Sequence, residues 1–119
     1  MAAPNIAAPT SVTGKTATQA IGTTATAIVS NAASSGKALR VTSLYVANVD
    51  GSANCDVTVD LYRGTTATRL ASTVVIPADA SVLIIGRDGP VWLEEGDSLR
   101  LTASAAGDLA AVCSYDEVA

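Results

Sequence analysis

Residues 92–104, WLEEGDSLRLTAS, gather three carboxylates around one glycine and then alternate apolar and polar side chains. Gly96 can adopt the left-handed backbone conformation that a turn needs, and the Asp97 side chain can accept a hydrogen bond from the backbone two residues on. After the turn, Leu99 and Leu101 occupy every second position, as in a strand with one buried face. We interpret the stretch as a turn at Gly96 and Asp97 that leads into a core strand.

A calcium site is the alternative interpretation of this stretch. Calcium loops need oxygen ligands that converge from several positions. Only Glu94, Glu95 and Asp97 are available here, and neighbouring residues of a strand point to opposite faces. We therefore place Glu94 and Glu95 at the rim of a turn and predict no metal, no cofactor and no catalytic residue.

The rest of the chain has the same character, with short runs rich in β-branched residues and separated by Gly, Asp, Asn and Pro. No helical periodicity persists over ten residues. The pattern predicts an all-β fold: an antiparallel β-sandwich, jelly-roll-like, with seven to eight short strands. The predicted strands span residues 24–30, 38–49, 55–63, 67–76, 81–87, 98–104 and 109–115.

Two of these runs depart from simple alternation. In residues 38–49 the apolar phase changes between Val41 and Leu44, which indicates a β-bulge or a strand covered on both faces. Residues 81–87 are nearly continuously apolar, as in a strand buried on both faces.

The first ten residues carry two prolines among alanines and show no periodicity. We expect an extended N-terminal arm over residues 1–10 and a single β-sandwich domain over 11–119. Such an arm can lie across a neighbouring subunit or add to the edge of its sheet. The expected partner-contact residues are Ala2, Ala3, Pro4, Asn5, Ile6 and Pro9.

The composition favours a protein that is stabilised by neighbouring subunits, and it argues against nucleic-acid binding and membrane insertion. The chain is 49% hydrophobic but 3% aromatic, so its core side chains are small and bury little area each, and neighbours can supply further stability. A net charge of −4 without a basic run argues against nucleic acid as a partner. We also expect no membrane span and no signal peptide, because the longest apolar runs are short and the first residues lack a basic segment.

The candidates for chemistry are few. Without histidine there is no histidine base or catalytic triad, and Cys55 and Cys113 lack CxxC spacing. We expect both thiols to be free, with one disulfide as the alternative. Asp56 and Asp60 lie four residues apart on one strand face, about 13 Å from each other, too far for a glycosidase pair, and we interpret them as solvated. The chain is predicted not to be an enzyme.

The aromatic residues Tyr45, Tyr62, Trp92 and Tyr115 could form a sugar- or protein-contact patch, or could be core and half-buried anchors. A cellular carbohydrate-binding β-sandwich is therefore one hypothesis. Clustering of Trp92 and a tyrosine on one exposed face, beside Glu94 or Asp97, would favour it.

The pattern Leu-x-x-Gly-Asp-x-Leu-x-Leu within residues 91–104 is similar to the turn before a late strand of C1q/TNF-like jelly rolls, although the aromatic core residues of those domains are scarce here. More closely, LRVTSLYVANVDGSANCDVTVDLYR (39–63), IPADASVLII (76–85) and LEEGDSLRLTASAAGDLAAVCSYDEV (93–118) resemble small β-sandwich virion proteins of tailed bacteriophages. The resemblance covers roughly residues 10–119 and brings no catalytic residues with it.

This resemblance implies a structural role in a virion assembled in the host cytoplasm. The leading hypothesis is a capsid decoration or cement protein that binds the major capsid protein or other virion proteins. We expect a homo-oligomer, with a trimer as one arrangement, because association would cover the edges of many short strands. The alternative is a component of the neck, tail or fibre tip, acting as a connector or host-glycan-binding module.

Overall fold

The computed structural model describes residues 3–119, which form nine β-strands and no helix. No helix within that range is therefore long and apolar enough to cross a membrane. The strands are β1 (Val12–Ile21), β2 (Thr26–Ser30), β3 (Ala38–Asn48), β4 (Cys55–Arg63), β5 (Thr66–Ile76), β6 (Ser81–Ile85), β7 (Val91–Leu93), β8 (Asp97–Ala103) and β9 (Leu109–Val118).

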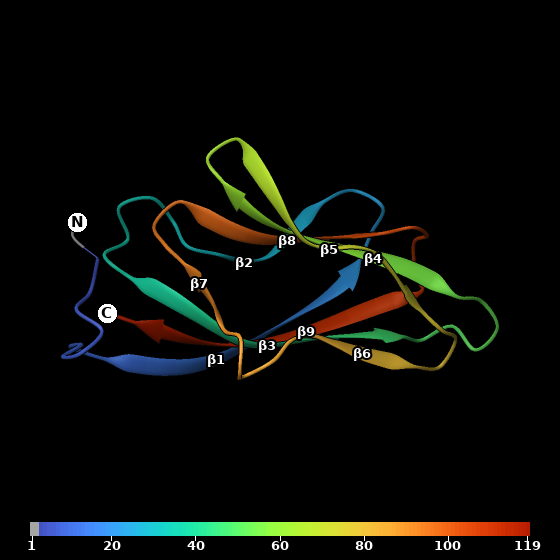
Figure 1. The fold of residues 1–119 in the computed structure, drawn as a ribbon, viewed down its shortest axis with the longest axis horizontal. Helices are drawn as coiled ribbons and strands as arrows, with labels where there is room; N and C mark the ends of the chain where they lie inside the picture. The colour runs from blue at the N-terminus through green and yellow to red at the C-terminus, as the bar shows by residue number, and fades with distance from the viewer. Residues whose placement is uncertain (1–2) are drawn as a thin grey trace.

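The strands form two antiparallel sheets that pack face to face (Figure 1). A five-stranded sheet has the order β1-β9-β3-β6, with β7 also paired to β3, and a four-stranded sheet has the order β2-β8-β4-β5. The pairs β1–β9, β2–β8, β3–β6 and β4–β5 are nested, as in one long hairpin rolled into a sandwich. This is the topology of a jelly roll, and the predicted all-β sandwich is confirmed.

Two strands were not among the predicted runs. β1 consists mainly of Thr, Ala and Gly with few large apolar residues, so its sequence carries a weak alternation signal, and β7 is only three residues long. The prediction that residues 81–87 are buried on both faces is wrong. In β6, Val82 and Ile84 pack against the core while Leu83 is 51% exposed, because no element of the described chain covers the outer face of this strand.

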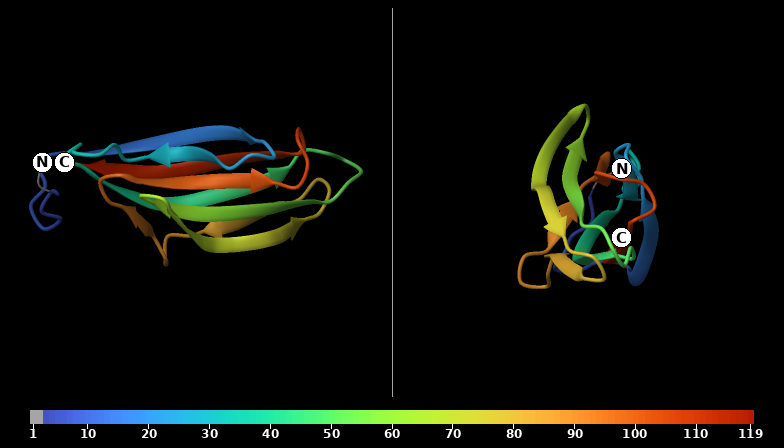
Figure 2. Two further views of the ribbon diagram at one scale, coloured as in Figure 1. Left: turned by 90° about the horizontal axis from the view of Figure 1, so that it is seen from above. Right: turned by 90° about the vertical axis from the view of Figure 1, so that its right-hand side faces the viewer.

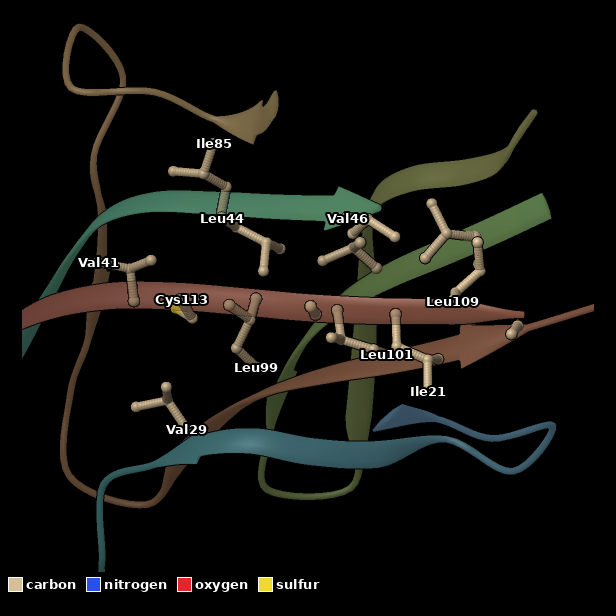
Figure 3. Packing of buried hydrophobic residues seen from close by; sticks show 14 of the residues in the cluster. Ile21, Val29, Val41, Leu44, Val46, Ile85, Leu99, Leu101, Leu109 and Cys113 are labelled. Carbon is tan, nitrogen blue, oxygen red and sulfur yellow. The ribbon is translucent and has the colours of Figure 1, made fainter. Parts of the chain in front are cut away.

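The core lies between the sheets and is built from the alternating positions of the strands. Leu44 of β3 and Cys113 of β9 point towards Leu99 and Leu101 of β8, and all four side chains are fully buried (Figure 3). Aliphatic and small side chains dominate this layer, as the composition predicts.

Register shifts occur in four of the strand pairings, and those of β3 with β9 and of β5 with β4 bear on the sequence pattern and the sheet edge. The register of β3 against β9 shifts between Val41 and Ser43, which accounts for the change of apolar phase seen in the sequence. The edge strand β5 has two irregularities against β4, and Thr73 at one of them adopts a φ of 46°. Its N–H donates to the Thr58 hydroxyl at 3.1 Å. Bulges of this kind twist an edge strand away from regular pairing.

The sandwich measures 48 × 26 × 19 Å, and the N- and C-terminal ends of the described chain lie at the same end of it (Figure 2). The segment before β1 is held there because the Thr10 and Ser11 N–H groups donate to the Ala119 carbonyl. Further out, the chain turns at residues 5–8, where the Ala7 N–H donates to the Asn5 side chain.

Candidate functional site

The structure places Gly96 in the turn between β7 and β8, with a φ of 88°, and makes Asp97 the first residue of β8. The Asp97 N–H donates to the Glu94 carbonyl at 3.0 Å, and the Asp97 carboxylate accepts the Glu94 N–H at 2.9 Å. The side chain therefore bonds three residues back, where the sequence suggested two residues on. The Gly96 N–H also donates to the Asn31 carbonyl, which ties the turn to a neighbouring loop.

Arg63, at the end of β4, donates hydrogen bonds to the carboxylate oxygens of this turn. It lies opposite Asp97 in the sheet ladder and donates through Nε and Nη2 to the two carboxylate oxygens, at 2.9 and 2.7 Å. Nη2 also contacts Glu94 at 2.7 Å. Hydrogen bonding from Arg63 lowers the pKa of Asp97, and the same contact raises the pKa of Arg63. Arg63 thus pairs with both Asp97 and Glu94, and the cluster is a structural clamp at the end of the sandwich.

Sequence reasoning missed Arg63, although one signal pointed to it. Arg63 continues the alternating positions of β4 after Val57, Val59 and Leu61, which places it on the side of the sheet that faces the core, at the end of the strand. Within residues 3–119, no three Cys, Asp or Glu side chains converge as a metal site would require.

The outer face of the four-stranded sheet is charged and carries the ion pair of Asp60 and Arg69. Asp60 is 8% exposed and accepts a hydrogen bond from Arg69 of β5 at 3.0 Å, so its predicted solvation is wrong. The reason is that β5 places Arg69 directly opposite Asp60. On the same face, the Arg100 guanidinium lies 3.8 Å from the centre of the Tyr62 ring.

Both cysteines are free and buried, as expected from the sequence. Burial raises the pKa of the Cys113 thiol to about 11, so the thiol is neutral and shielded. Cys55 contacts the Ser104 hydroxyl at 3.3 Å. Burial shields both thiols from solvent, and both residues act as small core side chains.

The four aromatic residues do not gather in one patch. Tyr62 is on the outer face of the four-stranded sheet, and Tyr115 packs against the core. Trp92 and Tyr45 share the outer face of the five-stranded sheet. Trp92 lies opposite Arg40, whose guanidinium carbon is 5.8 Å from the centre of the Trp92 ring. Arg40 and Tyr45 are five positions apart along β3, so the two aromatic side chains are separated. No tyrosine is placed beside Trp92 in the described part of the chain, so the arrangement that would favour a glycan site is not formed.

A hollow of about 420 Å³ opens near this tryptophan, lined by Arg40, Thr42, Arg87, Pro90 and Asp116. Two of these side chains already neutralise each other, because the Arg40 Nε donates to the Asp116 carboxylate at 3.1 Å. Charged and polar side chains line most of the hollow, unlike the mostly apolar pockets that hold small ligands.

The outer face of the five-stranded sheet is the most distinctive surface of the molecule. One row of side chains, here called the apolar row, crosses four strands and consists of Thr18, Val112, Tyr45 and Leu83. Its three large members are 40%, 49% and 51% exposed. The next row towards the far end, here called the alanine row, consists of Ala20, Ala110, Ala47 and Ser81.

This outer face is also almost uncharged. On the other side of the apolar row lie Thr16, Ser114 and Ser43, and beyond them the mutually paired Arg40 and Asp116. Solvent-facing sheet positions usually carry charged side chains, and the four-stranded sheet of this molecule does so. An extended face of small and apolar residues is typical of protein–protein contact.

The predicted partner-contact residues lie apart from this face, at the end of the sandwich where the chain termini meet (Figure 2). Ile6 is 53% exposed, Ala3 and Asn5 are exposed, and Pro4 and Pro9 are half-buried. Ala2 lies outside the described residues.

In comparisons with known proteins, no protein-family model matches this chain and no curated protein matches it. The function is therefore inferred from the surfaces described above and from the resemblance of the sequence motifs.

Proposed function

We propose that this chain is a non-enzymatic structural protein of a bacteriophage virion: a capsid decoration or cement protein that binds the major capsid protein. The sequence motifs that resemble phage virion proteins support this role, and the jelly-roll topology is compatible with it. The binding site is a surface built for contact with other proteins, and no catalytic residue is assigned.

The observation that carries the assignment to a protein-binding role is the flat, exposed apolar row of Val112, Tyr45 and Leu83 on the outer face of the five-stranded sheet. Small ligands are held in concave sites that surround most of their surface. A flat sheet face offers a small molecule one side only, but it can bury a large area against another protein. The geometry thus favours a protein partner over a substrate.

The segment before β1 offers a second contact surface. It lies outside both sheets, and Ile6 at its turn exposes an aliphatic side chain to solvent. A cement protein has to hold at least two neighbours, and many weak contacts of this kind become strong by avidity when the neighbours are arranged in an array. We assign this segment to the capsid contact.

Copy counting in purified virions of the phage that encodes the chain tests the proposal. Quantitative mass spectrometry should find about one copy per capsid subunit or per capsomer, and hence hundreds of copies, because decoration follows the symmetry of the shell. About three to eighteen copies would move the protein to the neck, tail or fibre tip, whose rings contain few subunits. Absence from the virion would overturn the proposal.

A truncation separates the arm from the sandwich. Deleting residues 2–8 keeps the bonds from Thr10 and Ser11 to Ala119, so the β-sheet circular dichroism should stay unchanged. We expect the truncated protein to bind capsids more weakly than the full chain in a co-sedimentation assay. Ile6→Ser tests the exposed aliphatic side chain alone, and Val49→Ser, at a 63% exposed position at the opposite end, is the matched control. Unchanged binding by the truncated protein would remove the arm from the proposed contact.

A further inference from the structure

We propose that the outer face of the five-stranded sheet binds the same face of a second copy of this chain, which gives a two-fold symmetric dimer. The inference rests on the proposed role as a protein-binding structural component, and it names the partner of this face. The capsid contact is assigned to a different surface, the segment before β1.

The first argument is that the face is complementary to itself. The apolar row of Val112, Tyr45 and Leu83 forms a ridge, and the alanine row beside it forms a groove. The two rows are two residues apart along the strands, about 7 Å. A two-fold axis parallel to the rows and midway between them places the ridge of each copy over the groove of the other.

Sheet packing supports the same arrangement. Two sheets that pack face to face lie about 10 Å apart, which requires large side chains of one sheet to meet small ones of the other. Here Tyr45 and Leu83 of one copy would face Ala47 and Ser81 of the other, and Val112 would face Ala110. A face with uniformly large side chains could not interdigitate in this way.

The area shared by the two faces is modest, as in a weak dimer whose population depends on concentration. Four strands about 4.8 Å apart give a width of about 19 Å, and the ten residues of β9 span about 34 Å. The axis lies level with Ala111, two residues from the start of β9, so the strands of the two copies overlap over about 17 Å and share a planar area of about 320 Å². Stable interfaces bury about 800 Å² on each partner.

Electrostatics favours this pairing over other parts of the surface. Arg40 and Asp116, the charged residues among the described strand positions of this face, neutralise each other at one end. The two-fold axis places the two copies of this pair at opposite ends of the dimer, about 34 Å apart, so like charges do not meet. The outer face of the four-stranded sheet would instead bury Asp60, Arg69 and Arg100 against a neighbour, at a desolvation cost.

Sedimentation velocity of the purified chain over about 1 to 100 μM tests the proposal, since the population of a dimer depends on concentration. The wild-type chain should sediment as a dimer at the upper end of this range. Val112→Lys puts a charge at the centre of the interface and should raise the dimer dissociation constant about 100-fold or more. Leu83→Lys, on β6, should also raise the dimer dissociation constant. Because the two substitutions lie on different strands, a folding defect in one variant would leave the other as a test.

Val75→Lys is the matched control, because Val75 is an exposed valine on β5 that faces outward from the other sheet, opposite Asp56. It should dimerise like the wild type, and all variants should keep the wild-type circular dichroism and thermal midpoint. A monomeric wild-type chain at 100 μM, a trimer, or dimers of undiminished stability in both lysine variants would each overturn the inference. Virion copy counts do not depend on this result, so failure of the dimer is distinguishable from failure of the proposed function.

Discussion

Replacing Asp97 with asparagine should destabilise the fold by about 2 kcal/mol. The Asp97 carboxylate is 2% exposed and accepts three hydrogen bonds, two from the Arg63 guanidinium and one from the Glu94 N–H. Asparagine keeps the shape of the side chain, but it offers one oxygen and turns N–H donors towards a guanidinium.

The magnitude follows from those contacts. A hydrogen bond to a charged group contributes about 1.5–3 kcal/mol, and Asp97→Asn loses at least one while weakening the others. The Arg63 side chain is 57% exposed, so in the variant water can hydrogen-bond to the guanidinium in place of the lost carboxylate oxygen. The net loss of stability therefore lies in the lower part of the range of about 1.5–3 kcal/mol. A loss of about 2 kcal/mol corresponds to a decrease of about 8 °C in the thermal midpoint for a domain of this size.

Equilibrium urea unfolding at pH 7, followed by far-ultraviolet circular dichroism, measures this change. Glu94→Gln is the matched control, because Glu94 contacts the same Arg63 nitrogen but its side chain is 70% exposed. An exposed ion pair contributes little, so this variant should unfold close to the wild type. Equal free energies of unfolding for the two variants would refute the conclusion that Asp97 stabilises the fold more than Glu94 does.

The same variant has a defined pH dependence. Arg63 lowers the pKa of Asp97 in the folded chain, so the stabilisation is fully present above the unfolded pKa of about 3.9 and is lost as the pH falls through the lower folded value. The difference between wild type and Asp97→Asn should therefore be constant above about pH 5 and shrink below about pH 4. A difference that persisted unchanged at pH 2 would contradict this assignment.

Three further outcomes are expected. Leu101→Ala should lower the free energy of unfolding in urea by about 3 kcal/mol, because Leu101 is fully buried. Leu70→Ala, at a 41% exposed position, should lower it by less than about 1 kcal/mol. Similar values for the two variants would contradict the burial pattern. Asn48→Ala should cost about 2 kcal/mol by the same measurement, because the buried Ile76 carbonyl loses its 2.9 Å donor, and a neutral effect would show that the bond is dispensable. Cys113 should react with a thiol reagent at pH 8 only as fast as the chain unfolds, since burial raises its pKa to about 11, and rapid labelling of the native protein would contradict that.

Several features of the fold followed from local sequence. The two-residue alternation in residues 55–63 matches the bounds of β4, and the phase change after Val41 marks a bulge in β3. These signals work because the direction of a side chain in a strand depends only on the backbone beside it. The glycine of the turn between β7 and β8 is recognisable for the same reason.

The surfaces and contacts on which the proposals rest are formed by residues far apart in the sequence. Arg63 meets Asp97 from 34 positions away in the sequence, and the apolar row is assembled from Val112, Tyr45 and Leu83 on three separate strands. Periodicity gives each of these residues a face of its strand, but it does not say which strands become neighbours or in what register.

The sequence by itself determined seven of the nine described strands, the turn at Gly96 and most of the inward-facing side chains, because these depend on local backbone geometry. Only the tertiary structure decided that β6 has an uncovered face, that Asp60 is shielded by Arg69, and that the exposed apolar side chains lie in one row. Strand order, register and the number of layers are set by long-range packing over the whole chain, and they determine which surface is left free to bind a partner.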